Sequence, residues 1–279
     1  MPRYGLVIDV TRCNGCYNCQ LACKDEFVGN DYPPYSLSQP ATGHFWMRIE
    51  ERERGKFPRV KVAYLPIPCM HCKDAPCIKT GVDGAVYQRK DGIVIIDPEK
   101  SKGKRKIVTS CPYGVIYWND KKSIPQKCTL CAHLLDRGWK EPRCVEACPT
   151  LALRFGDLDA PGSEFSRVVA SQKTEELHPQ FKTKPRVSYI GVPKVFIAGS
   201  IVFADTDECG VNTQVSLLDP SGSKIRSELA NGFGDFEFER IEDPGPYQLK
   251  VWAAGYEMKI LTIDLKEDTY LGEIVLRRI

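Results

Sequence analysis

Hydrophobic and polar residues alternate in short runs along the last part of the chain. Seven such runs lie at 195–203, 213–219, 224–229, 234–241, 246–253, 257–265 and 270–278. Turn-forming sequences separate several of them, among them Pro-Ser-Gly-Ser, Asn-Gly-Phe-Gly and Glu-Asp-Pro-Gly. A period of two residues is typical of strands with one buried face. The pattern predicts a small antiparallel β-sandwich over residues 195–279.

The segments before this sandwich differ in composition. Residues 156–194 are polar and contain prolines, so we expect a linker that follows a first domain at residues 1–155. Residues 28–68 are rich in Pro, Tyr and charge, with Phe45, Trp46 and Met47 together. That segment either covers a partner or packs internally.

Charge and hydropathy exclude some functions. The 279 residues include 39 Lys and Arg and 36 Asp and Glu, a net charge of +3, which is too balanced for a protein that binds nucleic acid through its phosphates. No apolar run approaches the roughly 18 residues of a membrane helix, so we expect no direct membrane insertion. The first residues lack the charged and apolar pattern of a secretion signal, so we expect none to be cleaved. We expect a cytoplasmic protein, with export alongside a partner that carries a twin-arginine signal as the alternative.

The cysteines indicate the chemistry. Of thirteen, twelve lie between Cys13 and Cys148, bunched at short intervals, and only Cys209 lies beyond them. Disulfide frameworks usually spread their cysteines to close loops. Bunching favours metal binding instead.

The first group favours iron–sulfur clusters over zinc. Cys13, Cys16, Cys19 and Cys23 have spacings of two, two and three residues, whereas a structural zinc site normally takes two separate Cys-x-x-Cys pairs. In ferredoxins with two clusters, the fourth cysteine of such a run binds the other cluster. Cys111 and Cys148 are each followed by proline, as at the end of the bacterial ferredoxin run.

The fourth-ligand rule predicts three 4Fe-4S sites and uses all twelve cysteines. Cluster 1 takes Cys13, Cys16, Cys19 and Cys148; cluster 2 takes Cys128, Cys131, Cys144 and Cys23; cluster 3 takes Cys69, Cys72, Cys77 and Cys111. Clusters 1 and 2 form one pseudo-symmetric ferredoxin module. Cys209 is expected to be an unligated thiol.

A fourth cluster with the same symmetry would need cysteines at Ser101, Lys104, Ile107 and Gly81. All four ligands are missing together, as if the site was emptied as a unit. An ammonium at Lys104 also argues against a three-iron cluster there. For the basic run from Lys100 to Lys106 we expect a solvated loop, the alternative being a basic contact that fills the vacated volume or touches a partner.

With its cysteine groups and the phrases at 91–100, 111–119 and 126–135, the chain resembles the iron–sulfur subunits of the dimethyl sulfoxide reductase class of molybdopterin oxidoreductases. The resemblance covers about the first 155 residues and implies an α+β fold, a double ferredoxin-like domain followed by the sandwich. It also implies electron transfer for a large catalytic subunit that holds Mo or W on bis-molybdopterin guanine dinucleotide. Heterodimers of this kind could assemble further. No catalytic residue is expected on this chain.

Three clusters and an added β domain look most like the small subunits of pyrogallol–phloroglucinol transhydroxylase and resorcinol hydroxylase, which implies a complex acting on polyhydroxylated aromatics. The alternatives are a subunit of another molybdopterin reductase or dehydrogenase, a free-standing polyferredoxin and a zinc-stabilised scaffold. The sandwich resembles prealbumin-like or carboxypeptidase regulatory-like domains, for which we expect a structural role.

Two further residues lie beside predicted ligands. His71 lies between Cys69 and Cys72, and Lys127 precedes Cys128. Either could bias a cluster electrostatically. For His71 we favour the simpler interpretation, that it faces solvent or packs on its loop; for Lys127 the sequence favours neither.

Overall fold

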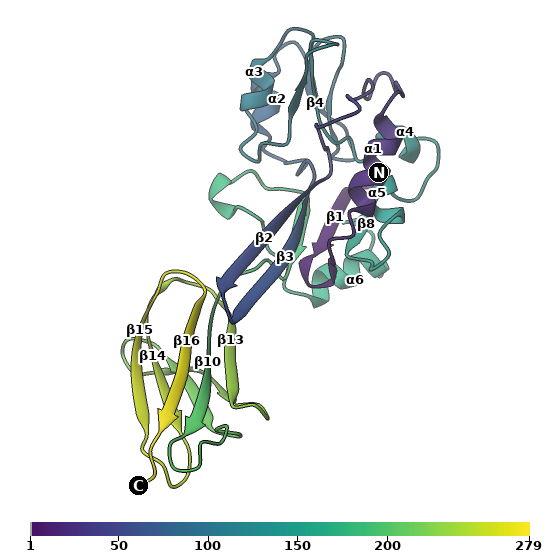
Figure 1. Ribbon diagram of the computed structural model, residues 1–279. Helices are drawn as coiled ribbons and strands as arrows, with labels where there is room; N and C mark the ends of the chain where they lie inside the picture. The colour runs from purple at the N-terminus through teal and green to yellow at the C-terminus, as the bar shows by residue number, and fades with distance from the viewer. Residues whose placement is uncertain (1) are drawn as a thin grey trace. The chain divides into compact units, whose positions relative to one another are not determined.

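The computed structural model describes residues 2–279, and the chain divides into two compact units (Figure 1). Unit 1 contains the chain up to Arg52 and Ala63–Val192, and unit 2 contains Glu53–Val62 and Pro193–Ile279. Helices and strands are both present, which confirms the α+β class.

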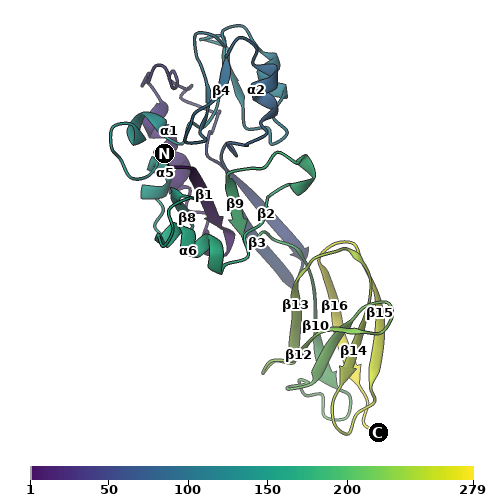
Figure 2. The same ribbon diagram turned by 180° about the vertical axis from the view of Figure 1, so that it is seen from behind.

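Unit 1 is built on a sheet of three strands. Strand β1 (Tyr4–Asp9) lies between β8 (Leu153–Asp157), which is antiparallel to it, and β9 (Val187–Ile190), which is parallel (Figure 2). Helix α1 (Asn18–Phe27) contacts α5 (Arg143–Glu146). Pairing of β1 with β8 therefore brings the first cysteine group close to the last one.

The rest of unit 1 consists of short elements around the other cysteines. Two hairpins are formed by β4 (Val86–Gln88) with β5 (Val94–Ile96) and by β6 (Tyr117–Asn119) with β7 (Ile124–Gln126). The short helices are α2 (Pro76–Thr80), α3 (Lys106–Thr109) and α4 (Ala132–Leu135), and single 3-10 turns are formed by η1 (Val10–Arg12) and η2 (Pro179–Phe181). Nine of the twelve clustered cysteines are buried in the core that these elements share: Cys19, Cys23, Cys69, Cys72, Cys77, Cys128, Cys131, Cys144 and Cys148.

The segment 156–194, which we expected to be a linker, is largely structured. It contributes α6 (Glu164–Ser171), which contacts β8, and β9 in the sheet of unit 1. Val187 and Tyr189 of β9 are buried, and the Tyr189 hydroxyl donates a hydrogen bond of 2.8 Å to the carbonyl of Pro66. A four-residue strand paired in parallel with a distant strand leaves little local signal, because its partner is far away in sequence.

Unit 2 contains the seven predicted strands, which confirms their positions within two residues. They are β10 (Val195–Phe203), β11 (Gln214–Leu218), β12 (Lys224–Leu229), β13 (Asp235–Ile241), β14 (Gly245–Trp252), β15 (Lys259–Leu265) and β16 (Thr269–Leu276). The two sheets have the strand orders β13-β10-β16 and β12-β11-β14-β15. The prediction of a purely antiparallel sandwich is wrong at one pair: β10 and β16 run parallel.

The hairpin of β2 (Arg48–Lys56) and β3 (Arg59–Ile67) contributes its tip to unit 2. There Lys61 pairs with Glu237 and Glu239. Before the hairpin, Trp46 and Met47 are buried in the core of unit 1, so this part of segment 28–68 packs internally.

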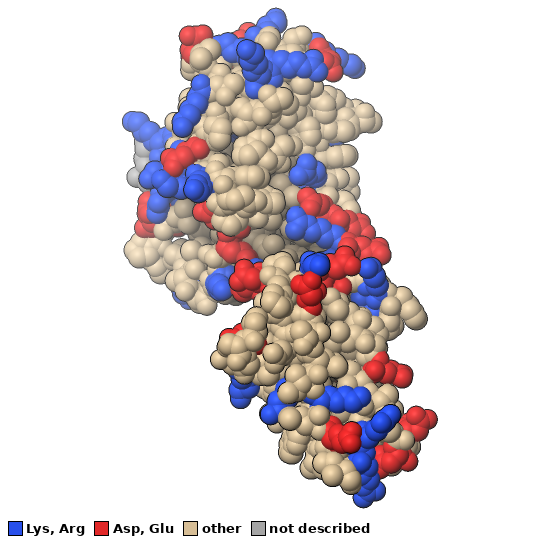
Figure 3. Space-filling view, turned by 90° about the vertical axis from the view of Figure 1, so that its left-hand side faces the viewer, with Lys and Arg blue, Asp and Glu red and all other residues tan. Residues whose placement is uncertain are grey.

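Charges of both signs are interspersed on the face shown in Figure 3, as expected from their near balance in the sequence. None of the helices formed by residues 2–279 has the length and apolar character needed to cross a bilayer.

Candidate metal centres

The four cysteines predicted for cluster 3 line one cavity. Cys69, Cys72, Cys77 and Cys111 all line it. They come from a loop before α2, from α2 and from the loop that follows α3. The other lining side chains are mostly apolar and include Met70, Val94 and Ile116. Four thiols around a mostly apolar cavity suit a thiolate-bound cluster, which needs sulfur ligands and surroundings that limit the access of water.

The four cysteines predicted for cluster 1 also lie near one another. Burial, together with the charges of Cys13, Cys148 and Cys16, raises the pKa of Cys19 to about 12. Burial likewise raises the pKa of Cys13, on which Cys148 and Cys16 also act. Cys148 therefore lies near the first cysteine group, because the pairing of β1 with β8 brings the two segments together. Cys16 is exposed and Cys13 is partly exposed, so this group is the most accessible of the three.

The cysteines predicted for cluster 2 gather inside unit 1. Burial raises the pKa of Cys23 well above its ordinary value, and the nearby charges of Cys128 and Cys131 raise it further. Burial does the same for Cys144, which is affected by Cys131, Cys128 and Cys23 in turn. The structure thus brings Cys23 of α1 to the group at 128–144.

All thirteen cysteines are free thiols, so the disulfide alternative finds no support between residues 2 and 279. Cys209 is exposed and lies in unit 2, apart from the twelve. In the described part of the chain, no three His, Cys, Asp or Glu side chains are grouped so that they would hold a single metal ion.

Three of the four Cys-x-x-Cys loops, those that begin at Cys13, Cys69 and Cys128, share one backbone feature. The third residue of each has a positive φ: Gly15 at 70°, His71 at 42° and Leu130 at 49°. This conformation turns its amide back toward the first sulfur, and the amides of His71 and Leu130 donate to Cys69 Sγ at 3.5 Å and Cys128 Sγ at 3.3 Å. Hydrogen bonds that backbone amides donate to the sulfur ligands raise the reduction potential of a cluster. Only the glycine is visible in the sequence as a left-handed position.

The positions of the missing fourth cluster are filled by protein. Ser101 and Ile107 are fully buried. At Gly81 there is no space even for a methyl group, because a Cβ would lie 2.4 Å from Val86 Cγ2. Packing of α2 against α3 thus occupies the volume that a cluster would need.

Lys104 is part of that packing. Its Nζ donates to the carbonyl of Val82 at 2.9 Å and to Asp83 Oδ2 at 3.3 Å. The expectation of a solvated loop is therefore wrong for Lys104, although Lys102 and Lys106 are exposed. Gly103 is the third residue of the segment Ser101–Lys104, which corresponds to a Cys-x-x-Cys loop, and it has a φ of 77°. The backbone at Gly103 therefore has the same left-handed conformation as the three cysteine loops, although no cysteine is present in this segment.

His71 is fully buried, so the interpretation that it faces solvent is wrong. The amide of Val94 donates to its Nδ1 at 3.0 Å. Burial lowers the pKa of His71 well below its ordinary value, and the charges of Lys127 and Arg186 act in the same direction. The imidazole is therefore neutral at physiological pH, with its proton on Nε2.

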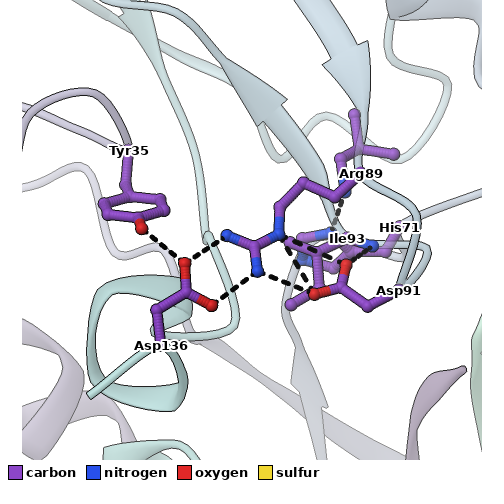
Figure 4. A network of polar contacts seen from close by, with 7 residues as sticks. Tyr35, His71, Arg89, Asp91, Ile93 and Asp136 are labelled. Atoms are coloured by element: carbon purple, nitrogen blue, oxygen red, sulfur yellow. Dashed lines mark hydrogen bonds and ion pairs between the residues drawn. The ribbon is translucent and has the colours of Figure 1, made fainter. Parts of the chain in front are cut away.

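An ion-pair network that the sequence did not reveal lies next to His71 (Figure 4). Arg89 bridges Asp91 at 2.9 Å and Asp136 at 2.6 Å, and the Tyr35 hydroxyl also donates to Asp136. The network connects the β4–β5 hairpin, beside the cluster 3 cysteines, to the chain after α4, beside the cluster 2 cysteines. Its members are scattered single residues, so no motif marks them.

Comparison with known proteins agrees with this arrangement. A 4Fe-4S dicluster domain family matches residues 60–158. The small subunit of pyrogallol hydroxytransferase from Pelobacter acidigallici is 43% identical over 91% of this chain and 92% of its own length. The iron–sulfur subunit of arsenate respiratory reductase from Shewanella sp. (strain ANA-3) is 33% identical over 67% of this chain and 96% of its length. A subunit of anaerobic dimethyl sulfoxide reductase from Escherichia coli (strain K12) is 34% identical over 66% and 87%.

These similarities, on a fold that gathers twelve cysteines in three groups, define the class. The chain belongs to the family of iron–sulfur subunits of the dimethyl sulfoxide reductase class of molybdopterin oxidoreductases, which transfer electrons within heteromeric complexes. Within that family it is similar over nearly its whole length to the pyrogallol hydroxytransferase small subunit, whereas the other two relatives match only about two thirds of it.

Proposed function

We propose that this chain holds three 4Fe-4S clusters and passes electrons to and from a molybdopterin-containing large subunit. The ligand sets proposed are Cys13, Cys16, Cys19 and Cys148 for cluster 1, Cys128, Cys131, Cys144 and Cys23 for cluster 2, and Cys69, Cys72, Cys77 and Cys111 for cluster 3. The observation that carries the proposal is the cavity lined by all four cysteines of the third set. A bound cluster supplies a site that accepts and returns one electron at a time.

The chain's own residues would hold each cluster and adjust its potential. Burial raises the pKa of most of these thiols, for example that of Cys72 to about 12. Such a thiol stays protonated unless a cation stabilises the thiolate, and iron supplies that cation. The apolar lining keeps water away, and the amides of His71 and Leu130 reach two of the sulfurs.

We propose that the partner holds Mo or W on bis-molybdopterin guanine dinucleotide and that the complex acts on polyhydroxylated aromatics, as a transhydroxylase or hydroxylase. The reason is the extent of the similarity: the match to the pyrogallol hydroxytransferase small subunit covers 91% of the chain. It therefore extends well into unit 2. We assign unit 2, a sandwich of the prealbumin-like type, a structural role, and we place the complex in the cytoplasm.

The test is anaerobic purification of the chain together with the proposed large subunit. We expect about twelve iron atoms per chain, four for each site, and a large chain in equal amount. About three zinc atoms and no iron would indicate a scaffold instead, and an iron-loaded species with the mass of the single chain would indicate a polyferredoxin. Cys111→Ser should remove the iron of cluster 3 alone, and Cys209→Ser is the matched control.

A further inference from the structure

Lys127 is a buried lysine that the proposed function does not yet use. Only 2% of the surface of Lys127 is exposed. Its Nζ donates to the carbonyl of Val94 in β5 at 2.5 Å and to the carbonyl of Cys128 at 3.0 Å. Two hydrogen bonds from different segments hold the ammonium group in one place.

That place adjoins two of the proposed sites. Lys127 lines the cavity of Cys69, Cys72, Cys77 and Cys111, and it directly precedes Cys128 of the cluster 2 group in the chain. The charge of Lys127 favours the thiolate forms of Cys77, Cys111 and Cys128. Cys69 and Cys128 also interact with each other, so the two groups of ligands are neighbours at this point.

The ammonium has no carboxylate to balance it. Between residues 2 and 279, no Asp or Glu oxygen lies within 4.0 Å of Lys127 Nζ. The buried His71 lies close enough to both Lys127 and Arg186 to feel their charges, and neither of these two cations can balance the other. A buried charge without a counter-charge is unfavourable. Four thiolates around an iron–sulfur core carry a net negative charge, so a cluster on either side would supply what the protein lacks.

We propose that Lys127 is a counter-cation shared by clusters 2 and 3, and that it raises the reduction potentials of both while leaving cluster 1 unaffected. This inference rests on the proposed function. Reduction adds one negative charge to a cluster, and a fixed positive charge in a dry interior stabilises that charge strongly. Because one ammonium serves both sites, it shifts the two potentials in the same direction. Lys127 is thus a positioning residue for the electron path.

The test is a redox titration of the intact complex, followed by electron paramagnetic resonance. Lys127→Met removes the charge with little change of volume, and Lys127→Gln removes it but keeps hydrogen-bond donors for the two carbonyls. In both variants we expect the reduced-to-oxidised ratio of clusters 2 and 3 at a fixed potential to fall at least tenfold, which is 59 mV for a one-electron couple. Lys127→Arg should restore most of the shift. Lys102→Met, which removes an exposed charge, is the control and should change nothing.

The outcomes separate this inference from the proposed function. A wild-type complex without three clusters contradicts the proposed function itself. If the wild type holds about twelve iron atoms and the neutral variants keep them with unchanged potentials, only the role of Lys127 is refuted. If both neutral variants lose iron from clusters 2 and 3 while Lys127→Arg retains it, the requirement for charge is supported. Loss of iron in all three variants would show that the lysine acts through its shape, and would overturn the proposal.

Discussion

Replacement of Ile107 by alanine tests whether the emptied fourth site is solidly packed. Ile107 is 0% exposed and stands where a cluster ligand would be. The substitution removes three buried carbons, worth about 2.4 kcal/mol at ~0.8 kcal/mol each. A residual cavity of roughly 50 Å³ adds about 1.2 kcal/mol at ~24 cal/mol per Å³. The sum of the two contributions gives an expected loss of roughly 3.5 kcal/mol in the free energy of unfolding.

The measurement is thermal unfolding of the anaerobic complex at one scan rate, because unfolding of such a protein is expected to be irreversible. At about 2–4 °C per kcal/mol, the midpoint should fall by roughly 7–14 °C. Lys102→Ala in the same loop changes an exposed side chain and should stay within about 0.5 kcal/mol of the wild type. If the unfolding midpoint of Ile107→Ala falls no further than that of Lys102→Ala, the volume around Ile107 is loosely filled and the reasoning is wrong.

Three other changes have definite expected results. Gly81→Ala should destabilise the protein by about 1–3 kcal/mol, because the new Cβ would lie 2.4 Å from Val86 Cγ2; an unchanged midpoint would show that Val86 moves freely. Tyr189→Phe should lower the free energy of unfolding by about 1 kcal/mol, because the 2.8 Å hydrogen bond to the carbonyl of Pro66 is lost. Equal unfolding midpoints for this variant and the wild type would contradict this prediction. Cys209→Ser should leave iron content and all three potentials as in the wild type, since this thiol is exposed and in unit 2, and loss of iron would make it a ligand.

The strands of unit 2 could be predicted because their signal is local. Each run alternates over six to nine residues and most are bounded by a turn, and β10 and β12 have the predicted bounds. Their pairing is not local. β10 and β16 lie side by side in parallel although Phe203 and its partner Leu276 are far apart in sequence. A turn signal indicates an antiparallel hairpin and says nothing about such a pair.

The grouping of the cysteines could be predicted for a similar reason. A Cys-x-x-Cys loop brings its two sulfurs together by itself, and the fourth-ligand rule supplies the distant member, as with Cys23 and the 128–144 group. The burial of His71 and Lys127 could not be predicted. Polar side chains are usually exposed, and only the tertiary packing around Val94 shows that both residues are enclosed and bonded to its backbone.

The filled fourth site bears on where the proposed electron path ends. Gly103 keeps the left-handed turn of a cluster loop, while Ile107 and the hydrogen-bonded Lys104 occupy the space. Removing one ligand alone would have left buried thiols and an open cavity, both of which are unfavourable. Replacement of all four positions removes that cost and leaves ordinary protein beyond α2. In the proposed path, cluster 3 is therefore the last site on this side, and Lys127 raises the potentials of both clusters that take part in the final step.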